Sequence, residues 1–132
     1  MQRPLPSDSE QLEQAMLERI SQLGIAADPK FVIDLIDSYA PLFEKHRASV
    51  HESLEKRDRN KLHYAAHSLK GAGLNVGASA LADVARTIEE KSETADFASM
   101  ESYLQELDSQ LSKTNGALQS IRSRMSLQLS SK

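Results

Sequence analysis

The sequence contains no cysteine and no tryptophan among its 132 residues. The absence of cysteine excludes a disulfide framework, a thiolate nucleophile and a cysteine-based metal site, and it fits a reducing compartment. No apolar run approaches the roughly 18–20 residues that a membrane helix needs. The first eight residues also lack the apolar core of a signal peptide. We therefore expect a cytoplasmic protein that does not insert into a membrane.

Basic residues are not in excess either. The chain has 16 lysines and arginines against 19 aspartates and glutamates, which gives a formal net charge of −3. A nucleic-acid-binding protein normally shows a basic excess or a basic stripe, so we do not expect a nucleic-acid partner. The length suffices for one domain with a core and is too short for two ordinary domains.

Good helix formers dominate the sequence, and the sustained alternation of a β-strand is missing. Short connections between long amphipathic helices make them antiparallel neighbours. We therefore predict an all-α fold, an antiparallel up-down four-helix bundle with an additional short N-terminal helix, in a single domain over 1–132. The predicted ranges are 1–8 for a flexible N-terminus, 9–23 for the capping helix, 29–57, 60–75, 79–93 and 96–124 for the bundle helices, and 126–132 for a flexible tail.

Capping and helix-breaking residues set these boundaries. Residues 7–9 offer N-cap oxygens before the first helix, and Gly24 offers a stop after it. Asp28-Pro29 has the character of an N-cap followed by the first helical position. Pro41 predicts a kink or a break inside the second helix. We expect the last helix to continue past Gly116.

Apolar residues recur at intervals of three and four and define the expected buried faces. In the second predicted helix these residues are Phe31, Leu35, Tyr39, Leu42, Phe43, Val50 and Leu54. In the third they are Leu62, Ala66, Leu69 and Gly73, and in the fourth Leu81, Val84, Ala85 and Ile88. At about 100° per residue, the third helix then carries His63, His67, Lys70 and Leu74 on the flank of its buried face, half open to solvent. The fourth helix carries Ala82, Arg86 and Glu89 on one flank.

His67 and Lys70 form a pair that suits phosphoryl chemistry. A neutral imidazole is a competent nucleophile near pH 7, because its unperturbed pKa is about 6.5. Attack by one ring nitrogen on a phosphoryl group gives a phosphoramidate, and a carboxylate should hold the proton of the other nitrogen. Glu89 lies 22 residues after His67 on the matching flank of the next helix, so it is the candidate. Lys70 supplies a point charge for phosphoryl oxygens.

Two glycines follow this pair inside the predicted helix. A helix-interior glycine costs about 1 kcal/mol relative to alanine, so each needs a compensating reason. Gly71 falls near His67 on the outer side, where it would let a partner approach. Gly73 falls on the buried face, where it would let two helices pack closely.

The segment from His67 to Ala78 resembles the signature of histidine-containing phosphotransfer (HPt) domains: His, any residue, Leu, Lys, Gly, and a further Gly six residues on. Lys70, Gly71 and Gly77 match its remaining positions. In the chemotaxis-kinase branch of this family a Glu 22 residues downstream orients the histidine, and other branches carry Gln; Glu89 matches the Glu version. Helix order and lengths extend the resemblance over roughly 28–118.

The resemblance implies a four-helix bundle that passes phosphoryl groups to and from aspartates of response-regulator receiver domains. His67 would be the phosphoacceptor, and a hybrid sensor histidine kinase would be a further partner of this monomeric protein. We expect Ser68, Gly71, Leu74 and Arg86 to contribute to the receiver docking surface. Arg86 could instead pair with Glu90 or be solvated. Met16 and Ile20 could extend an apolar docking patch or simply pack in the core, which is the favoured reading.

We expect no cofactor of the chain's own. The Mg²⁺ for the transfer would belong to the receiver, since no carboxylate cluster is visible here. Gly71-Ala72-Gly73 is too short for a nucleotide-binding loop and lies inside a helix, so we expect no ATP-dependent kinase activity. His63 and His67 have the i,i+4 spacing of helical zinc ligands, but no third ligand is evident.

Two hypotheses therefore remain. The first is a phosphorelay intermediate that carries a covalent phosphohistidine. The second is a non-catalytic helical adaptor that binds a signalling partner. The sequence favours the first, because a degenerate adaptor should have lost His67 or Lys70.

Overall fold

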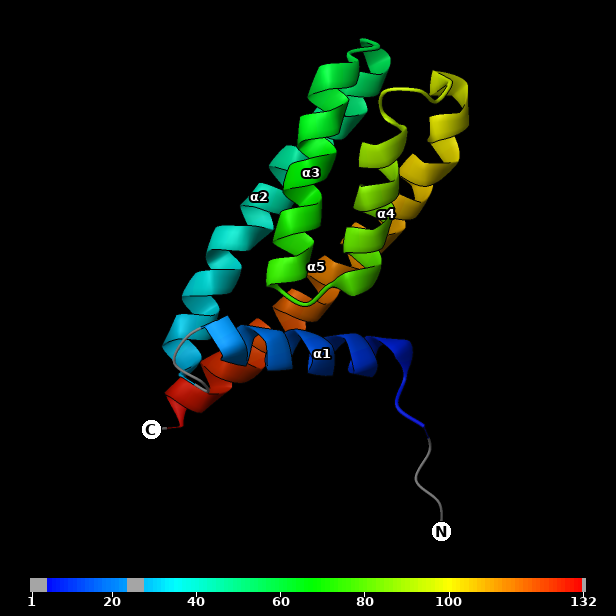
Figure 1. The fold of residues 1–132 in the computed structure, drawn as a ribbon. Coiled ribbons are helices and arrows are strands. Elements are labelled where there is room, and N and C mark those ends of the chain that lie inside the picture. Colours follow the sequence, from blue (N-terminus) through cyan, green and yellow to red (C-terminus); the bar gives the residue numbers. More distant parts are fainter. Residues whose placement is uncertain (1–4, 24–27, 132) are drawn as a thin grey trace.

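The structure is a computed structural model that describes residues 5–23 and 28–131. Within these ranges it is entirely helical, so the prediction of an all-α fold is confirmed. The elements are α1 (Asp8–Leu23), α2 (Pro29–Glu55), α3 (Arg59–Asn75), α4 (Ser79–Lys91), a 3₁₀ helix η1 (Phe97–Met100) and α5 (Glu101–Ser130). Helices α2 and α5 extend past the ends of α3 and α4, and α1 crosses the molecule there (Figure 1).

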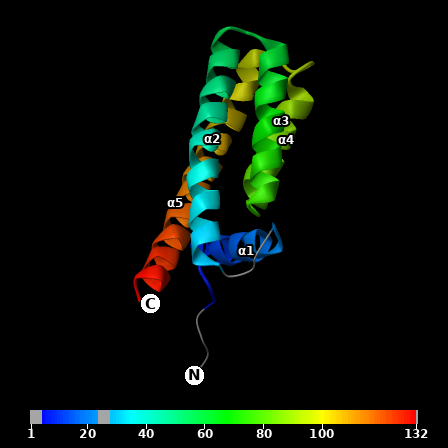
Figure 2. The ribbon, with the colours of Figure 1, turned by 90° about the vertical axis from the view of Figure 1, so that its left-hand side faces the viewer.

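The four helices α2 to α5 pack around one core. Helix α3 contacts α2 and α4, and α5 closes the set by contacting α2 and α4 from the other side. Helix α1 contacts α5 and α3 (Figure 2). The buried side chains form a single hydrophobic cluster. Met16 and Ile20 of α1 are 0% and 1% exposed, so they belong to this core and not to a surface patch.

The predicted buried faces of α3 and α4 are largely confirmed. Leu62, Ala66, Leu69 and Gly73 are all buried on α3. On α4, Leu81, Ala85 and Ile88 are buried and Val84 is half-buried, but Ala82, which was predicted on the flank, is buried too. These two short helices carry the candidate site, and their register on the core therefore fixes the positions of its side chains.

The prediction for α2 was partly wrong. Phe43 and Val50 are buried as expected, and Val32 and Ile36 are buried as well, whereas Phe31 and Leu35 are half-buried and pack against the core. Leu42 is 39% exposed. In this helix apolar residues surround much of the circumference, and periodicity alone did not select the face that the other helices cover.

Local capping explains where the helices begin. The hydroxyl of Ser7 accepts the backbone N–H of Glu10 at 3.1 Å, and the Glu10 carboxylate accepts the N–H of Ser7 at 3.4 Å, which is a capping box. Asp28 caps α2 by accepting the N–H of Lys30, and Asp58 caps α3 by accepting that of Lys61. The predicted stop at Gly24 lies outside the described residues.

Helix α2 is not broken at Pro41. The missing N–H leaves the carbonyl of Asp37 without its helical partner. Both residues are exposed, so water can hydrate that carbonyl in place of the lost hydrogen bond. This accessibility explains why the predicted break does not occur.

The C-terminal helix is longer than predicted. It continues past Gly116, as expected, and then to Ser130, so most of the predicted tail 126–132 is helical in the structure. Buried Ile121 and Met125 hold this part against the core. At the other end, the first residues of the predicted 96–124 helix form the separate 3₁₀ helix, with the carboxylate of Asp96 accepting the N–H of Ala98.

No helix in the described ranges combines the length and the apolar character needed to cross a lipid bilayer.

The ion pair between Asp37 and Arg122 ties α5 to α2 and gives a pH-dependent prediction. Arg122 donates to both carboxylate oxygens, at 2.8 and 3.0 Å, and these hydrogen bonds lower the pKa of Asp37. A carboxyl group whose pKa is lowered in the folded state stabilises the fold at pH values above its unfolded pKa. This stabilisation is lost as the pH falls through the folded pKa. Asp37→Asn should therefore lower the melting temperature slightly at pH 7 and have a smaller effect at the lowest pH.

The control for this experiment is Asp34→Asn on the same helix, because in the described structure the Asp34 carboxylate makes no ion pair. Thermal denaturation of both variants from pH 7 to pH 2 is the measurement. An Asp37→Asn difference that grew as the pH fell would contradict the assigned sign.

Candidate functional site

The candidate site lies where α3 and α4 pack side by side (Figure 1). His67 and Lys70 project from α3, and Glu89 projects from α4 toward them. The three side chains are 60%, 25% and 14% exposed. The histidine is thus open to solvent, and the carboxylate behind it is largely covered.

The ring of His67 is held by Glu89. Its Nδ1 lies 3.1 Å from Oε1 of the carboxylate. An ionised carboxylate only accepts hydrogen bonds, so Nδ1 carries the proton and donates it. In the neutral ring Nε2 then carries the lone pair, which is the tautomer that a nucleophilic attack through Nε2 requires.

The second oxygen of Glu89 is paired with Lys70. The Nζ of Lys70 lies 3.0 Å from Oε2. Oε2 is buried, and within the described residues it accepts no well-aligned hydrogen bond. The ion pair with Lys70 therefore compensates the burial of its charge. Burial of Glu89 raises its pKa, but Lys70 and His67 together lower the pKa by more than burial raises it. The pKa of Glu89 therefore lies below its ordinary value of 4.5. The carboxylate is ionised at neutral pH.

The glycines of the motif have different surroundings. A side chain at Gly71 would meet nothing within 4 Å, so this position on the surface of α3 faces open space. At Gly73 a Cβ would lie 3.4 Å from the backbone of both Ala78 and Ala82. Gly73 therefore allows α3 and α4 to pack closely, as predicted, whereas the role of the exposed Gly71 toward a partner stays a prediction.

Gly77 forms the turn between α3 and α4. Its φ of +78° lies in the left-handed region, which favours glycine. A Cβ there would come within 2.9 Å of Ala15 O and of Arg19 Cβ in α1. Arg19 also donates from Nε to the carbonyl of Leu74 at 3.3 Å. Helix α1 therefore rests directly on the end of the motif helix.

The predicted docking residues are spread over the site. Leu74 is 48% exposed and lies on the flank of α3 that carries His67. Arg86 precedes Glu89 on α4, is 52% exposed and pairs with Asp83 at 2.9 Å, so of the alternatives for this residue the pairing with Glu90 does not occur. Ser68 is half-buried and lines a shallow cleft with residues of α2, on the side of α3 away from Glu89.

Two neighbours of His67 were missed as site residues. The ring of His63 lies parallel to that of His67, with centroids 6.5 Å apart and an interplanar angle of 11°. Tyr64 is 68% exposed. It lies seven residues before Gly71, and this spacing of two helical turns could have revealed that both share the outer face. No group of three histidine, aspartate or glutamate side chains in the described ranges could hold a metal ion.

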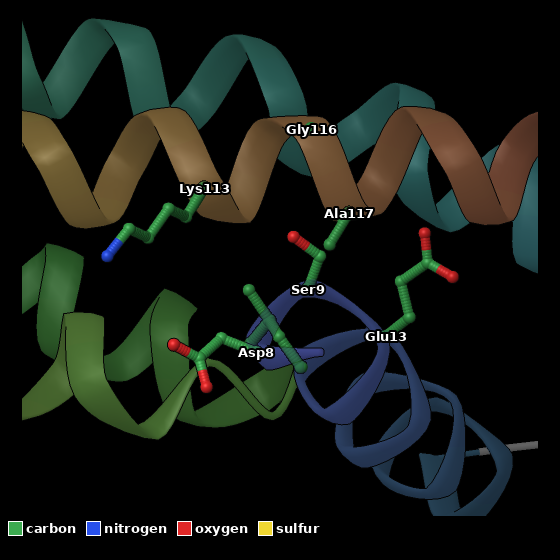
Figure 3. A pocket seen from close by; sticks show the side chains of 7 residues that line it. Asp8, Ser9, Glu13, Lys113, Gly116 and Ala117 are labelled. Carbon is green, nitrogen blue, oxygen red and sulfur yellow. The ribbon is translucent and has the colours of Figure 1, made fainter. Parts of the chain in front are cut away.

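Two other features lie outside this site. Asp108 of α5 accepts from Arg47 at 2.9 Å and contacts His51 Nε2 at 3.0 Å, which ties α5 to α2. A cavity of about 370 Å³ lies between α1 and α5, and Gly116 lines it (Figure 3). Its lining contains no histidine, and the polar residues that line it are Asp8, Ser9, Glu13 and Lys113.

Comparison with known proteins identifies one relationship. The family model described as "Hpt domain" matches residues 5–120, which include α1 to α4, the motif and most of α5. No curated protein and no solved structure gave a significant match.

Proposed function

The chain belongs to the Hpt domain family, and we propose that it carries a phosphoryl group on His67 as an intermediate of a multistep phosphorelay. Hpt domains perform histidine phosphotransfer in two-component phosphorelays. The observation that supports the assignment to His67 is its hydrogen bond to Glu89, 3.1 Å long, which leaves Nε2 as the nucleophilic nitrogen of an exposed ring.

The transfer follows from this geometry. Nε2 attacks the phosphorus of an aspartyl phosphate on a receiver domain, the P–N bond forms, and the aspartate carboxylate leaves. The ring gains positive charge, and its Nδ1–H remains bonded to the ionised Glu89, which stabilises that charge. Lys70 lies beside the same carboxylate and supplies positive charge near the phosphoryl oxygens. Microscopic reversibility allows transfer in the opposite direction.

In this proposal the chain needs no cofactor of its own, because Mg²⁺ is held by the receiver. It has no ATP-dependent kinase activity and receives phosphoryl groups that originate from a hybrid sensor histidine kinase. We also propose that α2 to α5 form an antiparallel up-down four-helix bundle in a single cytoplasmic, monomeric domain. The packing of α3 and α5 against both α2 and α4 supports this arrangement.

The test is phosphoryl transfer from purified receivers of the same genome, each phosphorylated with a radiolabelled small-molecule phosphodonor. The label should move from at least one receiver to this chain. Failure with every receiver would favour the alternative, a non-catalytic helical adaptor.

Glu89 gives a prediction for the orienting role. Glu89→Ala removes the acceptor of the Nδ1 proton and should slow the transfer by about a hundredfold, since a positioned proton-bonding group contributes on the order of 10²–10⁴-fold. Glu89→Gln retains an acceptor oxygen and should keep a larger share of the rate. Single-turnover transfer from the phosphorylated receiver is the measurement, and equal rates for the alanine variant and the native chain would refute the role.

Gly71 gives a prediction for docking, because we propose that the receiver contacts Gly71 with Leu74, Ser68 and Arg86. Gly71→Arg should slow transfer at low receiver concentration and leave the helical circular dichroism unchanged, since the new side chain meets open space. Gly116→Arg is the matched control, because a side chain at this helical glycine in α5 also meets nothing within 4 Å. Loss of helicity in the Gly71 variant would assign Gly71 to packing instead.

A further inference from the structure

Glu89 alone does not fix the orientation of His67. One hydrogen bond at Nδ1 sets the position of one ring edge, but a ring that is 60% exposed can still tilt about that bond and change rotamer. A nucleophilic nitrogen is efficient only in a narrow range of directions. A second contact, from a different direction, is needed to define the ring plane.

His63 supplies a contact of this kind. It lies one turn before His67 on α3, and the two rings are parallel within 11° with centroids 6.5 Å apart. This separation lies within the range in which offset aromatic rings attract each other. Glu89 therefore meets His67 at Nδ1, and the ring of His63 lies parallel to it and offset from it, one turn earlier on α3.

The ring of His63 is itself held in place. Its Nδ1 lies 3.5 Å from Oγ of Ser92, and Tyr64 packs edge-to-face on it with centroids 5.4 Å apart. Ser92 is buried, and its hydroxyl donates to the backbone carbonyl of Glu89 at 2.7 Å. The oxygen of Ser92 is left to accept from His63. Both rings are thus connected to Glu89: His67 contacts its side chain, and His63 contacts Ser92, which is bonded to its backbone carbonyl.

We propose that His63 is a positioning residue for the phosphoacceptor: its ring fixes the plane of His67 so that Nε2 points outward for attack. This inference rests on the proposed function of His67. The orienting role belongs to the flat ring of His63, for which the long contact of Nδ1 with Ser92 is only a secondary anchor, so His63 neither accepts the phosphoryl group nor exchanges a proton with His67.

Two substitutions separate the ring from its nitrogens. His63→Ala removes the face contact, and His63→Phe restores a flat ring without a nitrogen. The maximal rate of transfer should fall by about three- to tenfold for the alanine variant, the range expected for one aromatic contact. The receiver concentration at half-maximal rate should not change. The phenylalanine variant should recover most of the rate.

An NMR measurement on the unphosphorylated chain gives an independent readout. The ¹⁵N shifts of His67 should show the Nδ1–H tautomer in the native chain and in His63→Phe. In His63→Ala the freed ring should leave Glu89 for part of the time, so the shifts should show a mixture of tautomers. If the native chain failed to accept a phosphoryl group, the proposed function would be wrong, yet the tautomer shift would still decide whether His63 orients His67.

The control is His51→Gln, a histidine substitution on α2 whose side chain contacts α5, which should leave both readouts unchanged. Thermal denaturation checks that all variants are folded. The proposal is overturned if His63→Phe is as slow as His63→Ala, because the nitrogens would then be required. It is equally overturned if His63→Ala changes neither the rate nor the tautomer.

Discussion

His67→Gln is expected to abolish phosphoryl transfer to this chain. Glutamine has about the length of histidine and can still hydrogen bond to Glu89, but its amide nitrogen is not a nucleophile. The loss should exceed about a thousandfold, since the site then lacks the nucleophile that forms the covalent intermediate. The measurement is the amount of radiolabel that the chain acquires from a phosphorylated receiver in a single turnover.

The fold should survive this substitution. His67 is 60% exposed and makes no contribution to the hydrophobic core. Circular dichroism and thermal denaturation should therefore match those of the native chain, and receiver binding should persist. Label retained on His67→Gln would show that another residue accepts the phosphoryl group.

Gly77→Val is expected to have the largest effect on stability. A β-branched residue at a φ of +78° destabilises the fold by about 1–2 kcal/mol, because it must adopt the left-handed conformation. Its Cβ would also overlap with Ala15 O and Arg19 Cβ at 2.9 Å, and overpacking of this kind costs about 1–3 kcal/mol. The combined loss of about 2–5 kcal/mol is a large part of the roughly 5–15 kcal/mol that stabilises a typical domain.

Urea denaturation measures this loss, with Gly116→Ala as the control. Gly116 lies inside α5, and an added Cβ there meets no atom within 4 Å. Alanine should therefore stabilise the chain by about 1 kcal/mol at that position. A Gly77→Val variant as stable as the native chain would mean that α1 does not rest on the α3–α4 turn.

The register of α3 and α4 could be predicted from the sequence because each helix has one narrow buried stripe. The spacing of Leu62, Ala66, Leu69 and Gly73 placed His67 on a flank, and the same argument placed Glu89 on the facing flank. The structure brings the two side chains to 3.1 Å. At this site the helical periodicity of the sequence agrees with the tertiary packing, so the periodicity was sufficient to predict that His67 and Glu89 face each other.

The remaining features depend on contacts between elements distant in sequence. The contact of Gly77 with α1 follows from the positions of Ala15 and Arg19. No local sequence pattern around Gly77 predicts those positions. The predicted end of α5 at residue 124 was too early, since the helix continues to Ser130. Arg122 with Asp37 and Arg124 with Glu13 join its last third to partners more than eighty residues away. Helical spacing allows Arg86 to pair with either Asp83 or Glu90, and only the side-chain rotamer in the structure selects Asp83.

The packing of α1 on the motif helix has a consequence for function. Arg19 binds the carbonyl of Leu74, and Gly77 lies beneath the same helix, so changes in α1 act on the end of the helix that presents His67. The matched family region begins at residue 5 and therefore includes α1. The N-terminal helix is thus part of the unit that positions the site.

The most direct test of the central claim is the chemical location of the phosphoryl group. The ¹⁵N-labelled chain is phosphorylated by a receiver and examined by ³¹P and ¹⁵N NMR for coupling between phosphorus and a ring nitrogen. The structure predicts coupling to Nε2 of His67, with Nδ1 still protonated against Glu89. Coupling to Nδ1, or a phosphoryl group on any other residue, would contradict the account.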